Sequence, residues 1–309
     1  MTDTSASQPG SNPQQLVSDY WGVDRRQARP VSWLEHPVAL QRLHERVSGD
    51  PLIGTAQYWY NRYFSAPAGL CLSIGCGFGA LERSLISAGM VEHFHAHDLS
   101  ENAVARARRE AEAAGLGDRI DYRVTDLNSF SAPAETYDAI FGISSIHHVF
   151  ALENLFAQCR QALKPGALLF LDEYIGPSRF QCTPFVSQAI NRILQILPES
   201  YRRSVFAGGA PVVNYQNSSI SHFEATDPSE AIRSAEIIPT LKLYFDIIDF
   251  RPYGGAILHM LLSGLAGNFD EHHPRDVALL KAITLIEELL EEVGAIEPDF
   301  AAIVAKPKV

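Results

Sequence analysis

Short apolar runs alternate with amphipathic, helix-like segments through the middle of this chain. The first run, residues 70–74, stops at a turn with glycine at alternate positions, Gly75, Gly77 and Gly79, and a helix-like stretch follows at once. Glycine lets the backbone turn with positive φ and lets a ligand approach closely. A strand, a glycine turn and a helix start in this order are typical of a doubly wound nucleotide-binding fold.

The same alternation continues to the end of the chain. Strands are predicted over 91–96, 120–124, 137–143, 167–171, 244–250 and 300–305, and amphipathic helices over 152–163 and 277–293. A helix is also predicted to open at Asp227 as N-cap, with Pro228 in its first turn. Strands that alternate with helices favour an α/β fold around a mostly parallel sheet.

An acidic residue follows the second predicted strand. Asp98 lies at a distance from the glycine turn that suits a carboxylate holding a ribose diol. The glycines, however, read G-x-G-x-G rather than the dinucleotide pattern G-x-G-x-x-G. The spacing therefore favours a nucleoside ligand other than a dinucleotide.

The glycine turn, the Thr125-Asp126-Leu127 segment and the succession YDAI…HH…LKPGALLFLDE resemble class I S-adenosylmethionine-dependent methyltransferases, over about residues 70–174. The resemblance implies S-adenosylmethionine as cofactor and S-adenosylhomocysteine as product. It also implies a Rossmann-like, doubly wound, mostly parallel seven-stranded sheet whose last strand is antiparallel. By the same resemblance, the cofactor contacts are Ser73, Gly75, Cys76, Gly77, Gly79, Asp98, Leu99, Asp126, Leu127 and Ser144, with Asp126 on the adenine amino group.

Ser73 departs from the family pattern. The family usually has Asp or Glu two residues before the first glycine, where the carboxylate helps hold the charged end of the cofactor. Ser73 can accept a hydrogen bond but brings no charge. The departure implies either weaker cofactor affinity or a compensating group elsewhere.

Five segments are expected. They are a disordered leader (1–13), an N-terminal helical lid (14–66), the cofactor-binding core (67–175), a substrate-cover insertion (176–240) and the C-terminal part of the core (241–309). Most aromatic residues of the lid are expected to pack on the sheet, with Tyr20 and Tyr58 as the candidates that face the pocket. Arg179, in the insertion, is expected either to bind an acidic acceptor or to pair with a surface carboxylate.

The candidate catalytic residues follow the fourth and fifth predicted strands. An alcohol or phenol acceptor must lose a proton, and histidine titrates in the range that a base near neutral pH needs. His148 is the preferred base, with His147 as the other candidate, although either imidazole also suits a packing role. Glu173 is a second possible base or a partner that orients a histidine, and a capping role for it is equally open.

Composition excludes several other functions. The 309 residues carry a net charge of −11, which argues against a nucleic-acid partner, and no apolar stretch is long enough to span a bilayer. No secretory signal is evident at the N-terminus, and the four cysteines lack zinc-type spacing, so we expect a cytoplasmic protein with reduced thiols. His93, His95 and His97 alternate on one strand, which favours a strand surface, and no metal is predicted.

The sequence as a whole predicts transfer of a methyl group to an oxygen, in preference to a nitrogen, of a small-molecule or sugar-like acceptor. Two alternatives remain open at this point. A non-catalytic relative would keep the fold as a binding or scaffold module, which Ser73 allows. An NAD-dependent oxidoreductase would need a later third glycine and a second nucleotide-binding half, neither of which is seen. The oligomeric state is not predicted.

Overall fold

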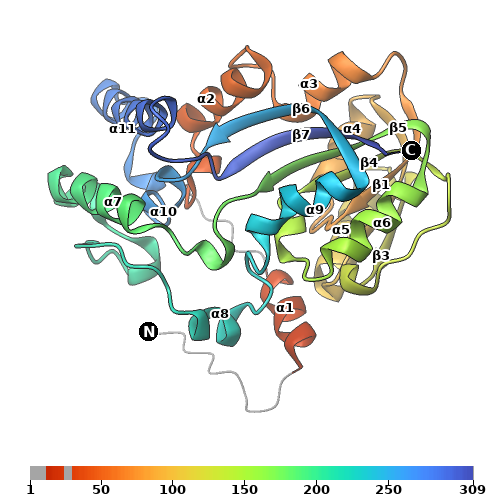
Figure 1. The fold of residues 1–309 in the computed structure, drawn as a ribbon, viewed down its shortest axis with the longest axis horizontal. Helices are drawn as coiled ribbons and strands as arrows, with labels where there is room; N and C mark the ends of the chain where they lie inside the picture. Colours follow the sequence, from red (N-terminus) through yellow and green to blue (C-terminus); the bar gives the residue numbers. More distant parts are fainter. Residues whose placement is uncertain (1–11, 24–29, 309) are drawn as a thin grey trace.

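The computed structural model describes residues 12–23 and 30–308, arranged around one twisted sheet (Figure 1). The seven strands lie in the order β3-β2-β1-β4-β5-β7-β6. They are β1 (Ala68–Ile74), β2 (Val91–Asp98), β3 (Ile120–Val124), β4 (Tyr137–Ile143), β5 (Leu163–Tyr174), β6 (Phe245–Gly254) and β7 (Phe300–Pro307). β7 runs antiparallel to both β5 and β6, and the other pairs are parallel. The predicted fold class is thereby confirmed.

The helices connect the strands and cover both faces of the sheet. They are α1 (Pro13–Trp21), α2 (Pro37–Ser48), α3 (Thr55–Tyr63), α4 (Ala80–Ser87), α5 (Glu101–Ala113), α6 (Leu152–Ala162), α7 (Pro184–Ile196), α8 (Ile220–Thr226), α9 (Ile237–Tyr244), α10 (Leu258–Leu261) and α11 (Pro274–Glu292). Short 3₁₀ turns include η3 (Leu127–Ser129), η4 (Ile146–His148), η5 (Ser178–Phe180) and η8 (Ser234–Glu236). The predicted leader up to residue 11 lies outside the described residues, and α1 already begins at Pro13.

Two apolar cores lie on opposite faces of the sheet. Side chains of α2, α3, α4 and α5 pack on one face, where Trp59 of α3 contacts Phe170 of β5 with ring centroids 5.3 Å apart. Side chains of α6 and α9 cover the other face. The alternation of side chains along each strand supplies both cores, since successive residues point to opposite faces.

The insertion between β5 and β6 extends beyond the sheet on the side where α1 lies, and α1 and α8 are neighbours there (Figure 1). The prediction of a helix that opens at Asp227 is wrong, because residues 228–233 form turns. The Asp227 carboxylate accepts the Ser229 amide at 2.9 Å, and the Arg179 guanidinium donates to the backbone oxygens of Pro228 and Glu230. Side chains from distant elements hold this segment, which we call the 228–233 turn.

Among the helices that the structure describes, none combines the length and the apolar character needed to cross a bilayer.

Candidate functional site

A cavity of about 430 Å³ lies at the carboxyl ends of β1, β2 and β4. Its volume is within the range of about 300–1,000 Å³ that is common for small-molecule sites. Ligands of open α/β sheets bind at this edge, where the strand order reverses on either side of β1. The lining residues come from α1, the glycine turn, the ends of β2 and β4, η3, η4 with the residues after it, and the 228–233 turn.

Two glycines of the turn have different physical roles. Gly77 has φ of +51°, and no atom lies within 4 Å of the position that a Cβ would take, so this backbone is open on the cavity that it lines. Gly79 has φ of +74°, and a Cβ there would stand 2.2 Å from the Tyr122 hydroxyl oxygen. Gly77 therefore leaves room for a ligand, whereas Gly79 lets α4 begin against β3.

Asp98 ties the glycine turn to the start of α5. Its Oδ2 accepts the Gly77 amide at 2.8 Å and its Oδ1 accepts the Ser100 amide at 2.8 Å. Burial raises the pKa of the Asp98 carboxyl, and the amide hydrogen bonds counter this in part. Each oxygen keeps a second lone pair, and Asp98 lines the cavity, so the carboxylate is placed to accept bonds from a ribose diol.

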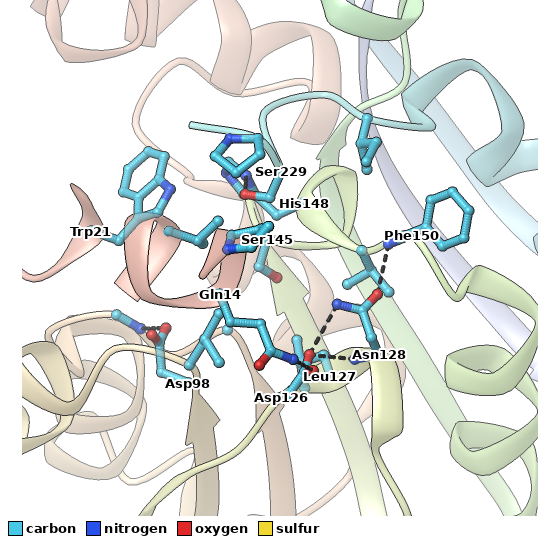
Figure 2. A pocket seen from close by; sticks show the side chains of 18 of the residues that line it. Gln14, Trp21, Asp98, Asp126, Leu127, Asn128, Ser145, His148, Phe150 and Ser229 are labelled. Carbon is cyan, nitrogen blue, oxygen red and sulfur yellow. Dashed lines mark hydrogen bonds between the residues drawn. The ribbon is translucent and has the colours of Figure 1, made fainter. Parts of the chain in front are cut away.

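Asp126 lies on the same side of the cavity as Asp98 (Figure 2). Its Oδ1 accepts the backbone and side-chain nitrogens of Asn128, both at 2.9 Å. Its Oδ2 accepts the side-chain nitrogen of Gln14 of α1 at 2.6 Å. An NH₂ group thus already binds one oxygen of the carboxylate that the resemblance assigns to the adenine amino group.

The opposite side of the cavity carries Trp21, His148 and Ser229, which Figure 2 shows facing the two aspartates across the open space. The Trp21 indole nitrogen donates to Asp227 Oδ2 at 2.7 Å, and its ring meets the His148 ring edge-on at 4.9 Å. α1 therefore spans the cavity, with Gln14 on one side and Trp21 on the other.

The two histidines of η4 have different partners. His147 Nδ1 lies 2.8 Å from Glu173 Oε2, while Glu173 Oε1 accepts the amides of Ser145 and Ile146 at 2.6 and 2.7 Å. His148 Nδ1 lies 2.9 Å from the Ser229 hydroxyl. Only His148 of the two lines the cavity.

The electrostatic environments of the two rings also differ. Burial lowers the pKa of His147, but the hydrogen bond and charge of Glu173 outweigh it, so the pKa is raised overall. Burial and the neighbouring His147 hold the pKa of His148 well below its usual value. Burial raises the pKa of the nearby Glu230 carboxyl to about 7.

Most of the residues that the sequence assigns to the cofactor do line the cavity. They are Gly75, Gly77, Asp98, Leu99, Asp126, Leu127 and Ser144. Ser73, Cys76 and Gly79 do not line it. Ser73 is buried beside the Glu82 carboxylate of α4. Burial raises the pKa of Glu82 to about 7, although the nearby Ser73 hydroxyl partly offsets this rise.

The three predicted substrate contacts lie elsewhere. The Tyr58 hydroxyl donates to Asp249 Oδ2 of β6 at 2.6 Å, away from the cavity. Tyr20 packs edge-on against Trp21, which lines the cavity in its place. Arg179 holds the 228–233 turn through backbone oxygens and does not line the cavity, so neither of its predicted roles applies.

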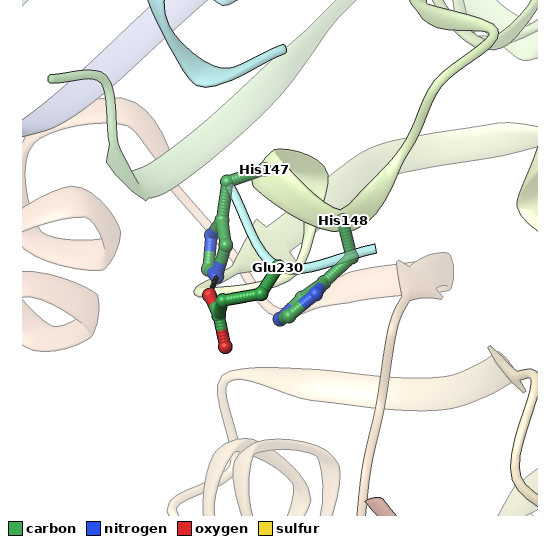
Figure 3. A group of neighbouring side chains, drawn as sticks. All are labelled: His147, His148 and Glu230. Atoms are coloured by element: carbon green, nitrogen blue, oxygen red, sulfur yellow. Dashed lines mark ion pairs between the residues drawn. The ribbon is translucent and has the colours of Figure 1, made fainter. Parts of the chain in front are cut away.

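The structure also gathers a group of metal-type ligands that no spacing in the sequence indicated. Ligand atoms of His147, His148 and Glu230 lie within 4.8 Å of one another (Figure 3). The sequence prediction of no metal considered His93, His95 and His97 instead, and of these His97 is bonded to Thr125 and His95 to Tyr137. Glu230 is remote from the histidines in sequence, so only the folded insertion could bring it to them.

Comparison with known proteins shows which family model and which relatives the sequence matches. Residues 71–166 match the family model described as a methyltransferase domain. The chain is 32% identical over 165 residues to the ubiquinone biosynthesis O-methyltransferase of Methylocella silvestris, a match that covers 50% of this chain and 58% of that protein. It is also 36% identical over 102 residues to the protein of that name from Parvibaculum lavamentivorans, covering 32% of this chain and 38% of the relative. The chain thus spans less than two thirds of the length of these curated relatives.

A structural relative has the same fold over the whole chain. The geranyl diphosphate C-methyltransferase of Streptomyces coelicolor, solved with Mg²⁺, geranyl diphosphate and S-adenosyl-L-homocysteine, covers 97% of this chain and 100% of its own at a TM-score of 0.54 and 15% identity. Residues 71–166 therefore match a methyltransferase domain in sequence, and the chain as a whole has the fold of a known methyltransferase. The resemblance drawn from the glycine turn is confirmed, and S-adenosylmethionine is the cofactor of this class.

The described residues fit such a cofactor. The open space over Gly77 leaves room for the part of the ligand nearest the turn, and the Asp98 and Asp126 carboxylates match a diol and an amino group. Apolar contacts come from Leu99 and Leu127.

Proposed function

We propose that this protein transfers a methyl group from S-adenosylmethionine to a hydroxyl oxygen of a small, largely apolar acceptor. One observation carries the proposal: the glycine turn, Asp98 and Asp126 line one side of the cavity, and His148 lines the other. Oxygen is preferred over nitrogen because a candidate base faces the cofactor side.

The lining supports an uncharged acceptor. Trp21, Val149, Phe150 and Ile232 supply apolar surface, and no Lys or Arg among the described residues lines the cavity. Since Arg179 is engaged by backbone oxygens, it is not available to bind a phosphate or carboxylate. A phenol or apolar alcohol therefore suits this lining better than a sugar or an anion.

When bound, S-adenosylmethionine supplies a methyl group on a sulfonium, which an acceptor oxygen takes in an in-line displacement that leaves S-adenosylhomocysteine. The chain aligns the acceptor and excludes water, and α1 covers the cavity for this purpose. His148 Nε2 takes the acceptor's proton. His147 and Glu173 act as positioning residues, because Glu173 binds the amides that shape η4.

The experiment has two stages. Calorimetric titration with S-adenosylhomocysteine, with NAD as control ligand, should give micromolar binding of the former alone. Transfer of labelled methyl from S-adenosylmethionine to a panel of phenols, alcohols and amines then tests the acceptor. His148→Ala should bind S-adenosylhomocysteine as wild type does but slow turnover about 10²–10⁴-fold, while the exposed His93→Ala should change neither.

Two results would contradict the proposal. Binding of S-adenosylhomocysteine without transfer to any member of the panel would favour a scaffold role for the domain. Transfer to amines alone would replace oxygen by nitrogen as the acceptor atom.

A cytoplasmic location belongs to the same proposal, supported by four free cysteines.

A further inference from the structure

Three side chains from two distant segments meet beside the cavity. His147 and His148 come from η4, after β4, and Glu230 comes from the 228–233 turn of the insertion (Figure 3). His147 Nε2 lies 3.6 Å from Glu230 Oε1. The three side chains are buried or half-buried, so the group lies within the protein and is not a surface cluster.

The hydrogen bonds of His147 determine which of its nitrogens carries a proton. Glu173 Oε1 accepts two backbone amides, and we assign the contact at Oε2 to the Nδ1–H of His147. In the neutral ring the proton is then on Nδ1, which leaves the Nε2 lone pair directed toward Glu230. A carboxylate behind a histidine in this way is the usual outer partner of a metal-ligating imidazole.

His148 is oriented in a similar way. The Ser229 hydroxyl donates its one proton to Asp227 Oδ1 at 2.6 Å, so its oxygen accepts the Nδ1–H of His148 at 2.9 Å. The Nε2 lone pair of His148 is thereby left without a proton. Two imidazoles with fixed tautomers thus offer Nε2 lone pairs in one small region.

The third donor is a carboxylate with few partners. Among residues 12–23 and 30–308, no hydrogen bond of 3.5 Å or less reaches the Glu230 carboxylate, and its nearest ion-pair contact is His147 Nε2. The Arg179 guanidinium of η5 donates to backbone oxygens of the turn, and Arg233 of the turn pairs with Glu153 and Glu236. The Glu230 carboxylate therefore lies beside two imidazole rings with no hydrogen-bond donor on its oxygens among these residues.

We propose that His147, His148 and Glu230 bind one divalent transition-metal ion of the zinc type, with at least one open coordination position toward the cavity. Two histidines and one glutamate form a donor set of catalytic zinc sites, and the same set with open positions also binds ferrous iron. Tetrahedral ligands at about 2.0–2.1 Å from zinc lie about 3.3 Å apart, close to the 3.6 Å between His147 Nε2 and Glu230 Oε1.

This inference rests on the proposed function and changes one detail of it. With the ion bound, His148 is a ligand and not a free base. An acceptor hydroxyl at the open position would coordinate the ion and lose its proton to solvent more readily, because a Lewis acid lowers the pKa of a bound hydroxyl. His148 lines the cavity, so an ion on its Nε2 lies at the acceptor side.

The test uses the full chain, treated with a chelator and dialysed. Titration with Co²⁺, followed by visible absorption, and with Zn²⁺, followed by calorimetry, should give one ion per chain at submicromolar affinity. His147→Ala and Glu230→Gln should each weaken binding at least 100-fold, and Glu173→Gln about 10–100-fold as an outer partner. His272→Ala, an exposed histidine, should bind as wild type does.

Circular dichroism and S-adenosylhomocysteine binding of each metal-free variant show whether it is folded. Absence of binding by wild type, or equal binding by wild type, His147→Ala and Glu230→Gln, would overturn the metal site. Methyl transfer by fully metal-free wild type at an unchanged rate would overturn the part of the ion in the reaction while leaving the proposed function intact. Failure of S-adenosylhomocysteine to bind any form would instead count against the proposed function.

Discussion

Replacement of Asp98 by alanine tests the assignment of the cofactor pocket directly. The carboxylate binds the Gly77 and Ser100 amides at 2.8 Å each and keeps lone pairs toward the cavity. If it also accepts both hydroxyls of a ribose, Asp98→Ala removes two hydrogen bonds to a charged group. Each contributes about 1.5–3 kcal/mol, so affinity should fall by about 3 kcal/mol or more.

Such a loss corresponds to a dissociation constant for S-adenosylhomocysteine raised about 150-fold or more, since about 1.4 kcal/mol is a factor of ten. Calorimetry at 25 °C measures it. The same change leaves two backbone amides without their acceptor, which costs about 1–3 kcal/mol of stability each. The variant is therefore checked by thermal unfolding before titration, and Asp118→Ala, at an exposed aspartate of the same domain, is the matched control. A folded Asp98→Ala protein that binds within threefold of wild type would refute the mapping of the pocket.

Two further predictions concern buried and bridging polar groups. Burial raises the pKa of Glu82 to about 7 from an ordinary 4.5. As pH rises, the Glu82 carboxyl therefore loses its proton at lower pH in the unfolded chain than in the folded one. The free energy of unfolding falls progressively between about pH 4.5 and 7 as a result. Glu82→Gln should therefore gain about 3 kcal/mol relative to wild type between pH 5 and 8, measured by denaturant unfolding. A pH-independent difference, like that expected for the exposed Glu92→Gln, would contradict this. Gln14→Ala frees Asp126 Oδ2 from an exposed hydrogen bond. Because that bond contributes about 0.5–1.5 kcal/mol, S-adenosylhomocysteine should bind several-fold more tightly by calorimetry, and weaker binding would show that Gln14 supports the cofactor instead.

Local sequence determined the core of this domain. The turn around Gly77 and the strands 120–124 and 137–143 form as predicted, because glycine geometry and short-range apolar periodicity act within a few residues. Ser100 caps α5 as its type and position indicate, accepting the Ala103 amide. Asp98 and Asp126 reach the cavity because parallel strands bring their carboxyl ends to one edge.

Contacts between distant segments decided the rest. Trp21 and not Tyr20 lines the cavity, and Tyr58 instead binds Asp249, because the helices of the lid segment pack separately on different elements. No local pattern encodes that choice, since several aromatic residues offer similar surface.

The 228–233 turn is a second feature that local sequence does not predict. A proline after Asp227 satisfies the local rule for a helix start, yet bonds from Arg179 and Trp21 hold this segment as a turn. The turn then carries Glu230 to His147. The sequence by itself determined the cofactor side of the site through local geometry, whereas the acceptor side depends on long-range packing of the insertion and α1, which only the tertiary structure decides.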